Sequence, residues 1–287
     1  MSYLRRVYRL PAELEESLVA DLWQAGTLGV STESEPDGRL RLTAWFEPEA
    51  PPPPGIEHIS HVSHISDDEL PDTDWMAEYR RRAVPFPLGR TLLIDPREPE
   101  EAETPAAVPA GRRLLRLPAR TAFGIGSHES TVLALELLEE AELSGRAVLD
   151  VGTGTGILAF AALAWGAARV VAFDADPVAV LQARANRRLN GLHPLLFAGR
   201  AAALAPDPFD LVVVNVVPEE ILPDLADLLP LLAPGGALIL SGLLAERAAK
   251  VAARLAACGL RETGETGETG RRSRGDWTAL RLSREAS

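Results

Sequence analysis

Strand-like and helix-like segments alternate between residues 113 and 287, and no other feature restricts the fold of this chain as strongly. Short apolar runs predict strands, and longer runs with apolar residues on one face predict helices. The predicted strands are 147–151, 169–174, 211–217, 237–241 and 277–282, and the predicted helices are 157–165, 177–190, 219–232 and 245–258. Such alternation is typical of an α/β fold with a mostly parallel, doubly wound sheet.

The first 65 residues predict a separate and smaller α+β unit. A helix from Pro11 to Trp23 carries leucines four residues apart. Alternating residues favour strands at 3–10, 27–34 and 40–46, and residues 56–65 favour a further strand, or a strand plus a turn. We expect these elements to form a compact two-layer sandwich.

Residues 66–112 predict a linker between the two units. The segment Asp74–Arg82 favours a short helix, whereas Asp95–Pro109 is acidic, rich in proline and favours a flexible loop. A second loop is indicated at 264–269, where the triplet Gly-Glu-Thr occurs twice in succession.

A glycine-rich turn connects the first predicted strand of the large unit to its helix. Gly152, Gly154 and Gly156 follow Asp150 at this crossover, where glycines let the backbone bend sharply and let a ligand lie against main-chain amides. Dinucleotide sites use the spacing G-x-G-x-x-G, whereas this turn has G-x-G-x-G. The spacing favours S-adenosylmethionine, whose α-amino group suits Asp150, although a plain tight turn would look similar.

Asp174 ends the next predicted strand, roughly 20 residues further on. A carboxylate at this position can accept hydrogen bonds from both ribose hydroxyls of a nucleoside. The alternative is a helix cap ahead of Pro177, a role that Asp176 would serve better. The turn and Asp174 together indicate a cofactor with a nucleoside, and NAD is the competitor.

Asn215 ends a buried apolar strand, at the sheet edge where open α/β sheets bind ligands. Its amide oxygen could hold a substrate amine with the nitrogen lone pair aimed at a methyl group. The alternative is a strand-end asparagine that satisfies a loop.

A second glycine-rich segment, 123–131, precedes a predicted helix. Its glycines allow the backbone to fold over a ligand, and Phe123 could cover the face of that ligand. Ser127, with Ser130 or Thr131, is predicted to cap the helix. We expect His128 to be structural, because an isolated histidine is more often structural than catalytic.

Composition restricts the partners of the chain. A net charge of −12 argues against nucleic acid as the main partner and suits a basic protein substrate. Cys258 is the only cysteine, so no internal disulfide can form, which fits a reducing cytoplasm. We expect neither a signal peptide nor a membrane span, because no apolar run has the required length.

Three histidines, His58, His61 and His64, fall on the predicted strand 56–65. Along a strand, His61 would face away from the other two. We therefore expect a solvated strand and no metal site.

Three segments, 123–131, 149–156 and the strand that ends at Asn215, together resemble the PrmA-type methyltransferases, which modify ribosomal protein L11 of the large subunit. Residues 74–81, the turn 234–236 and the terminal segment 276–280 also match, so the resemblance covers nearly the whole chain. The sequence departs from the family pattern at Ile125, Ser127, Glu129 and Ser130.

The resemblance implies a substrate-recognition domain with a ferredoxin-like fold at 1–65 and a class I, Rossmann-like methyltransferase domain at 113–287. It implies that Thr131, Gly152, Asp174 and Asn215 contact S-adenosylmethionine, with Phe123 nearby. The implied reaction methylates lysine side chains of ribosomal protein L11, with an N-terminal amine as a further acceptor. We expect a cytoplasmic monomer.

Other functions remain open from the sequence alone. One is a methyltransferase for another protein, a nucleic-acid base or a small molecule, although residues 215–218 lack the aromatic residue that would stack a flipped base. An NAD-dependent dehydrogenase is disfavoured by the glycine spacing. A ribosome-binding module with a vestigial cofactor fold is the third alternative.

Overall fold

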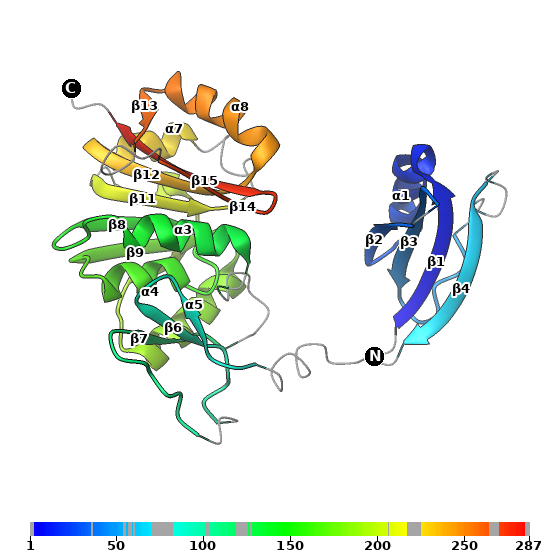
Figure 1. The fold of residues 1–287 in the computed structure, drawn as a ribbon, viewed down its shortest axis with the longest axis horizontal. Helices are drawn as coiled ribbons and strands as arrows, with labels where there is room; N and C mark the ends of the chain where they lie inside the picture. The colour runs from blue at the N-terminus through cyan, green and yellow to red at the C-terminus, as the bar shows by residue number, and fades with distance from the viewer. Residues whose placement is uncertain are drawn as a thin grey trace. The chain divides into compact units, whose positions relative to one another are not determined.

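The computed structural model describes residues 3–35, 37–53, 56, 59, 61–70, 83–100, 104–118, 126, 128–205, 207–216, 225–263 and 270–284. The chain divides into two compact units, Met1–Glu78 and Tyr79–Ser287. The division lies inside the region that the sequence assigns to a linker. Figure 1 shows the helices and strands of each unit.

In its described residues, the N-terminal unit is a four-stranded antiparallel sheet with one α-helix on it. Its strands are β1 (Tyr3–Pro11), β2 (Gly29–Ser34), β3 (Arg39–Phe46) and β4 (Ser63–Leu70), in the order β2-β3-β1-β4. Helix α1 (Glu15–Gln24) follows a 3₁₀ turn at Ala12–Leu14. Leu18 and Leu22 are fully buried against the sheet because they share one helix face. This order is that of a ferredoxin-like sheet, so the predicted α+β unit is confirmed.

The strand predicted at 56–65 is wrong in its bounds. His61 has φ +71°, a left-handed conformation that a strand does not allow, and β4 begins only at Ser63. The alternation of apolar residues before Ser63 therefore does not reflect a strand. Because β4 continues to Leu70, the N-terminal sheet extends beyond the predicted end at residue 65.

The larger unit is built around an eight-stranded sheet. Its strands are β8 (Ala147–Val151), β9 (Arg169–Asp174), β10 (Leu195–Ala198), β11 (Phe209–Asn215), β12 (Leu232–Leu244), β13 (Leu260–Glu262), β14 (Arg271–Arg274) and β15 (Trp277–Arg284). Along the order β10-β9-β8-β11-β12 all strands are parallel, and β15 pairs antiparallel with β12, β13 and β14. The predicted α/β fold is confirmed. The strand order reverses beside β8, which is where such sheets bind ligands at their carboxyl ends.

Helices cover both faces of this sheet. One apolar cluster joins α3 (Glu129–Glu139), α4 (Ile157–Ala164) and α5 (Pro177–Asn190) to one face, where α3 and α4 lie together (Figure 1). A second cluster joins α7 (Leu225–Leu228) and α8 (Ala245–Ala256) to the other face. Side chains of β8 alternate between the clusters, Val148 in the first and Leu149 in the second. The central strands are therefore buried on both faces, as parallel strands usually are.

The sequence analysis missed a small sheet, of which two strands lie within the predicted linker and the third begins directly after it. This sheet contains β5 (Phe86–Leu88), β6 (Leu92–Asp95) and β7 (Arg113–Arg116), and its Leu88, Ile94 and Leu115 join the first apolar cluster. Its strands have only three or four residues, too few for a clear alternation. Asp95, the predicted start of a flexible loop, is instead a buried residue of β6.

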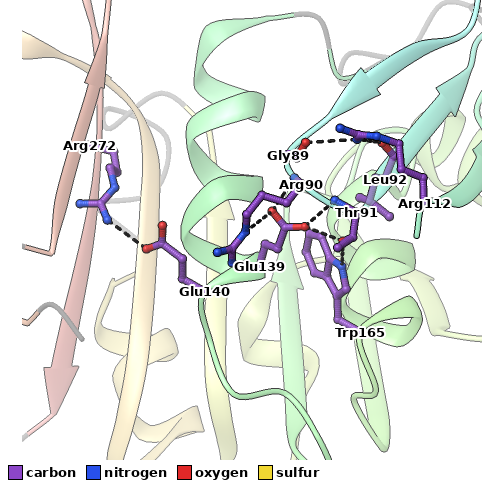
Figure 2. A network of polar contacts seen from close by, with 9 residues as sticks. All are labelled: Gly89, Arg90, Thr91, Leu92, Arg112, Glu139, Glu140, Trp165 and Arg272. Atoms are coloured by element: carbon purple, nitrogen blue, oxygen red, sulfur yellow. Dashed lines mark hydrogen bonds and ion pairs between the residues drawn. The ribbon is translucent and has the colours of Figure 1, made fainter. Parts of the chain in front are cut away.

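Glu139 at the end of α3 attaches this small sheet to the rest of the larger unit, as Figure 2 shows. Its buried carboxylate accepts the backbone N–H groups of Arg90 and Thr91, each at 2.8 Å, and the Thr91 hydroxyl. The indole of Trp165 donates to the same hydroxyl at 2.8 Å. The neighbouring Glu140 pairs with Arg272 on β14 instead.

Several other element bounds differ from the prediction. In the predicted helix 219–232, α7 spans only Leu225–Leu228, a 3₁₀ turn follows at Leu229–Leu231, and 219–224 lie outside the described residues. The strand predicted at 237–241 is wrong in length, because β12 has 13 residues. The linker helix at 74–82 and the repeat at 264–269 lie outside the described residues. In the described part of the chain, no helix is long and apolar enough to span a membrane.

Candidate active site

Asp150 is a fully buried carboxyl group at the end of β8. Its Oδ2 accepts the Thr153 hydroxyl at 2.7 Å and the Ala159 N–H at 3.1 Å, whereas its Oδ1 has no hydrogen-bond partner among the described residues. Burial raises the pKa of Asp150 to about 7, although the hydrogen bond from Thr153 lowers it. The side chain therefore lies behind the glycine turn and ties that turn to α4.

The glycine turn adopts backbone conformations that other residues rarely reach. Gly152, Gly154 and Gly156 have φ values of +69°, +52° and +88°. A Cβ on Gly152 would lie 2.4 Å from Cγ1 of Val216, and one on Gly156 would lie 2.5 Å from the ring of Phe160. Glycine is thus required by both conformation and space, and the main chain is left as the surface of the turn.

Asp174 connects the end of β9 to the glycine turn. Its Oδ2 accepts the N–H of Gly154 at 2.9 Å, and its Oδ1 accepts the N–H of Asp176 at 3.0 Å. Asp176, not Asp174, caps α5, because its carboxylate accepts the N–H of Val178 at 2.8 Å. The helix-cap alternative for Asp174 is therefore excluded, and each of its oxygens retains a lone pair for a further donor.

Asn215 ends β11, next to the glycine turn. Its strand pairs with β8 on one side, and Val216, which follows it, contacts Gly152. Its Nδ2 donates to the Thr131 hydroxyl at 3.1 Å, although 84 residues separate the two in sequence. Thr131 itself is fully buried in the first turn of α3.

The cap of α3 differs from the prediction. His128 is the N-cap residue, and its Nδ1 accepts the N–H of Ser130 at 3.3 Å and contacts the Ser130 hydroxyl at 2.9 Å. The prediction that Ser127, with Ser130 or Thr131, caps α3 is therefore wrong, because the imidazole of His128 accepts the N–H group that a serine cap would accept. The ring of His128 also lies edge-on to that of Trp277, with 4.8 Å between the ring centroids. Phe123, Ile125 and Ser127 lie outside the described residues.

The structure adds two supports of the site that the sequence analysis missed. Asn186 is fully buried in α5, and its Nδ2 donates to the carbonyl of Thr155 at 3.0 Å. Gly242, at φ +82°, lies so close to Val216 that a Cβ would be 2.6 Å from the carbonyl oxygen of Val216. The sequence does contain a signal for Asn186. It is a polar residue on the apolar face of α5, three residues after Ala183.

A metal site does not form among the described residues, where no group of three His, Cys, Asp or Glu side chains could hold an ion. His64 pairs with Asp67 at 2.7 Å on β4. His61 lies before that strand, so the shared strand predicted for the histidines is wrong, and His58 lies outside the described residues.

Comparison with known proteins identifies the family. The model of "Ribosomal protein L11 methyltransferase (PrmA)" matches residues 12–285. The chain belongs to the PrmA family of ribosomal protein L11 methyltransferases.

Members of the PrmA family are similar to this chain along most of its length. A ribosomal protein L11 methyltransferase of Deinococcus radiodurans is 35% identical over 255 residues, 84% of this chain and 85% of the relative. One of Pelobacter propionicus is 41% identical over 221 residues, 74% of this chain and 67% of the relative.

A solved structure is similar to this chain as well. The crystal structure of a ribosomal protein L11 methylase from Lactobacillus delbrueckii subsp. bulgaricus is 31% identical, with a TM-score of 0.62, and covers 70% of this chain and 98% of that one. The predictions of a class I methyltransferase fold, methylation of ribosomal protein L11 and S-adenosylmethionine as methyl donor are confirmed by this membership.

Proposed function

We propose that this chain methylates lysine side-chain amines of ribosomal protein L11, with its N-terminal amine as a further acceptor. The observation that carries the proposal is the meeting of the glycine turn, Asp174 and Asn215 at the ends of adjoining strands. The glycine turn and Asp174 suit a cofactor with a nucleoside and an amino acid part. Asn215 is the polar side chain best placed to meet an amine.

The residues of the turn fit S-adenosylmethionine. Gly152 and Gly156 leave main chain where any side chain would fill the space, and Asp174 stands where ribose hydroxyls would be accepted. We assign Gly152, Gly154, Gly156, Asp174 and Asn215 to cofactor binding. Phe123 and Thr131 remain expectations from the family resemblance.

Asp150 contributes to this site through the turn. Its carboxylate is fully buried and already accepts two hydrogen bonds from Thr153 and Ala159. The cationic amino group of the cofactor near the turn would favour the ionised form of Asp150. We therefore assign Asp150 to positioning of the turn that binds the amino acid part.

When bound, S-adenosylmethionine supplies a methyl group on a cationic sulfur, which keeps the C–S electron pair and leaves as S-adenosylhomocysteine. The attacking amine must be neutral, whereas free lysine, with a pKa of about 10.4, is mostly protonated at pH 7. The Oδ1 atom of Asn215 accepts an N–H of the neutral amine and leaves the lone pair aimed at the methyl group. The rate then comes mainly from alignment and exclusion of water.

The N-terminal unit is assigned to recognition of the substrate. Residues 1–78 contain 16 acidic and 5 basic side chains, whereas residues 79–287 contain 25 and 24. An acidic unit attracts a basic ribosomal protein and repels nucleic acid. We assign a cytoplasmic monomer as the working form.

Transfer of label from S-adenosylmethionine to purified ribosomal protein L11 tests this proposal. We expect label on the wild-type substrate, and loss of label when its lysines are changed to arginine and its N-terminus is blocked. Asn215→Ala should lower kcat at least about tenfold. Absence of label on wild-type ribosomal protein L11 would refute the proposal.

A further inference from the structure

The N–H groups in the first half of the glycine turn attach it to β9. Those of Gly152 and Thr153 both donate to the carbonyl of Phe173, each at 2.9 Å. That of Gly154 donates to Asp174 at 2.9 Å. These bonds fix the first half of the turn, whereas the second half, which leads into α4, depends on contacts of its own.

A side chain of α5 holds the second half of the turn. Nδ2 of Asn186 donates to the carbonyl of Thr155 at 3.0 Å, although 31 residues separate the two in sequence. In the same peptide, the N–H of Gly156 donates to the carbonyl of Thr153 at 2.8 Å. Because a carbonyl oxygen only accepts hydrogen bonds, the Asn186 amide can meet it in one orientation alone, with Nδ2 toward the turn.

Asparagine is an unfavourable residue at this position if it serves packing alone. The Asn186 side chain is fully buried, and its Oδ1 has no hydrogen-bond partner among the described residues. A buried acceptor without a donor lowers stability, a loss that an apolar residue would avoid. The bond from Nδ2 to the turn is therefore the property of Asn186 that an apolar residue would lack.

This bond acts where the backbone is least restricted. Gly156 has φ +88° and no side chain, so its residue type does little to restrict rotation of the peptide that joins it to Thr155. With the Thr155 carbonyl bound to α5, the turn keeps its shape before a ligand arrives. Such preorganisation raises affinity, because less conformational entropy is lost on binding.

We propose that Asn186 is a positioning residue for S-adenosylmethionine, which acts through the carbonyl of Thr155 and keeps the glycine turn in its binding shape. Because the bond shapes the turn and does not involve Asn215, its loss should weaken cofactor binding and leave the transfer step nearly unchanged. This inference rests on the proposed assignment of the turn to the cofactor.

The test measures binding and turnover in variants of the full chain. Asn186→Ala should raise the Kd of S-adenosylmethionine in calorimetry about tenfold, the upper range for one hydrogen bond. The KM for S-adenosylmethionine should rise by the same factor, with kcat at saturating cofactor and ribosomal protein L11 within about threefold of the wild type. Asn186→Ser is a second variant, whose short hydroxyl pairs with the main chain of its own helix. It should raise the Kd as Asn186→Ala does.

Asn190→Ala is the matched control, one helical turn further along α5. The Asn190 amide accepts the N–H of Arg116 on β7 at 2.7 Å and donates to the carbonyl of Arg116 and to that of Asn186, each at 2.8 Å. The same truncation therefore breaks hydrogen bonds of the same helix without touching the turn. We expect a lower Tm, with the Kd of S-adenosylmethionine within about threefold of the wild type.

Three results would overturn the inference while the proposed function stands: an unchanged Kd in both variants of Asn186, a loss of kcat without a change in Kd, or an equal rise of Kd in Asn190→Ala. Failure of the wild-type chain to methylate ribosomal protein L11 would instead refute the proposed function, and calorimetry would still decide the role of Asn186 in cofactor binding.

Discussion

At the scale of single residues, the site depends on side chains and glycines that tolerate little change. Gly152 is restricted by both its φ of +69° and the nearness of Val216. Asp150 is restricted by complete burial and by two donors on one oxygen. Both shape the same turn, one from the ligand side and one from behind.

Gly152→Ala should weaken the binding of S-adenosylmethionine at least about tenfold, because the new Cβ needs a shift of Val216 or of the turn itself. Gly191→Ala is the control, since Gly191 has φ +62° but no atom within 4 Å of the added Cβ. It should cost about 1–2 kcal/mol of stability and leave affinity unchanged. Calorimetry and Tm measure both, and equal loss of affinity in the two variants would contradict the role of the turn.

Asp150→Asn should make Tm less dependent on pH. The pKa of Asp150 is about 7 in the folded chain and 3.8 as the unfolded reference, so its contribution to stability is complete below pH 4 and is lost as pH rises to 7. Between pH 5.5 and 8.5 the free energy of unfolding of the wild type should fall by about 2 kcal/mol, whereas that of the variant should not. This corresponds to a difference of roughly 5 °C in Tm.

Thermal denaturation at these two pH values measures this difference. Asp207→Asn, which removes an exposed carboxylate of the same unit, is the control. An Asp150→Asn variant with the pH profile of the wild type would show that the carboxyl group does not titrate in this range.

At the scale of secondary-structure elements, α3 connects otherwise separate parts of the large unit. Its first turn holds Asn215 through Thr131, and its last residue, Glu139, holds the loop between β5 and β6 (Figure 2). A Cβ on Gly89 in that loop would lie 2.7 Å from Glu139 Oε2, so the loop fits closely around the carboxylate. The small sheet is therefore part of the framework of the site.

Glu139→Ala should destabilise the chain by about 3 kcal/mol, because it removes the buried carboxylate that accepts the N–H groups of Arg90 and Thr91 and the Thr91 hydroxyl. Glu140→Ala removes an equal charge from the neighbouring position, where the ion pair with Arg272 is partly exposed. It should cost less than about 1 kcal/mol. Urea denaturation compares the two, and similar costs would contradict the anchoring role of Glu139.

At the scale of the whole molecule, the acidic excess lies in the smaller unit, whereas the proposed cofactor site lies in the larger one. Residues 79–287 have their own apolar clusters and their own sheet. Recognition and methyl transfer are therefore assigned to different units of the chain.

A fragment of residues 79–287 should fold and bind S-adenosylmethionine with a Kd within about threefold of the full chain. Its KM for ribosomal protein L11 should rise at least about tenfold, because the acidic unit no longer attracts the substrate. Steady-state kinetics at low and high salt measure this. Salt should raise KM for the full chain more than for the fragment, and an unchanged KM in the fragment would contradict recognition by the N-terminal unit.

Local sequence determined five of the eight strands of the large sheet, the glycine turn and the strand ends at Asp174 and Asn215. Hydrophobic periodicity reports which residues are buried, and parallel strands bring their carboxyl ends to one edge. These two facts predict the candidate site from the sequence alone. Where periodicity is short or absent, as in β5, β6 and the segment before Ser63, the same reasoning failed.

Only the tertiary structure decided how the polar side chains are paired. The bond from Asn215 to Thr131 joins residues 84 apart, and the bond from Thr91 to Glu139 joins residues 48 apart. Such pairs depend on how helices cross the sheet and on the register of its strands, which local patterns do not encode. The position of Asn215 thus follows from the sequence, but its hydrogen-bond partner follows from the fold.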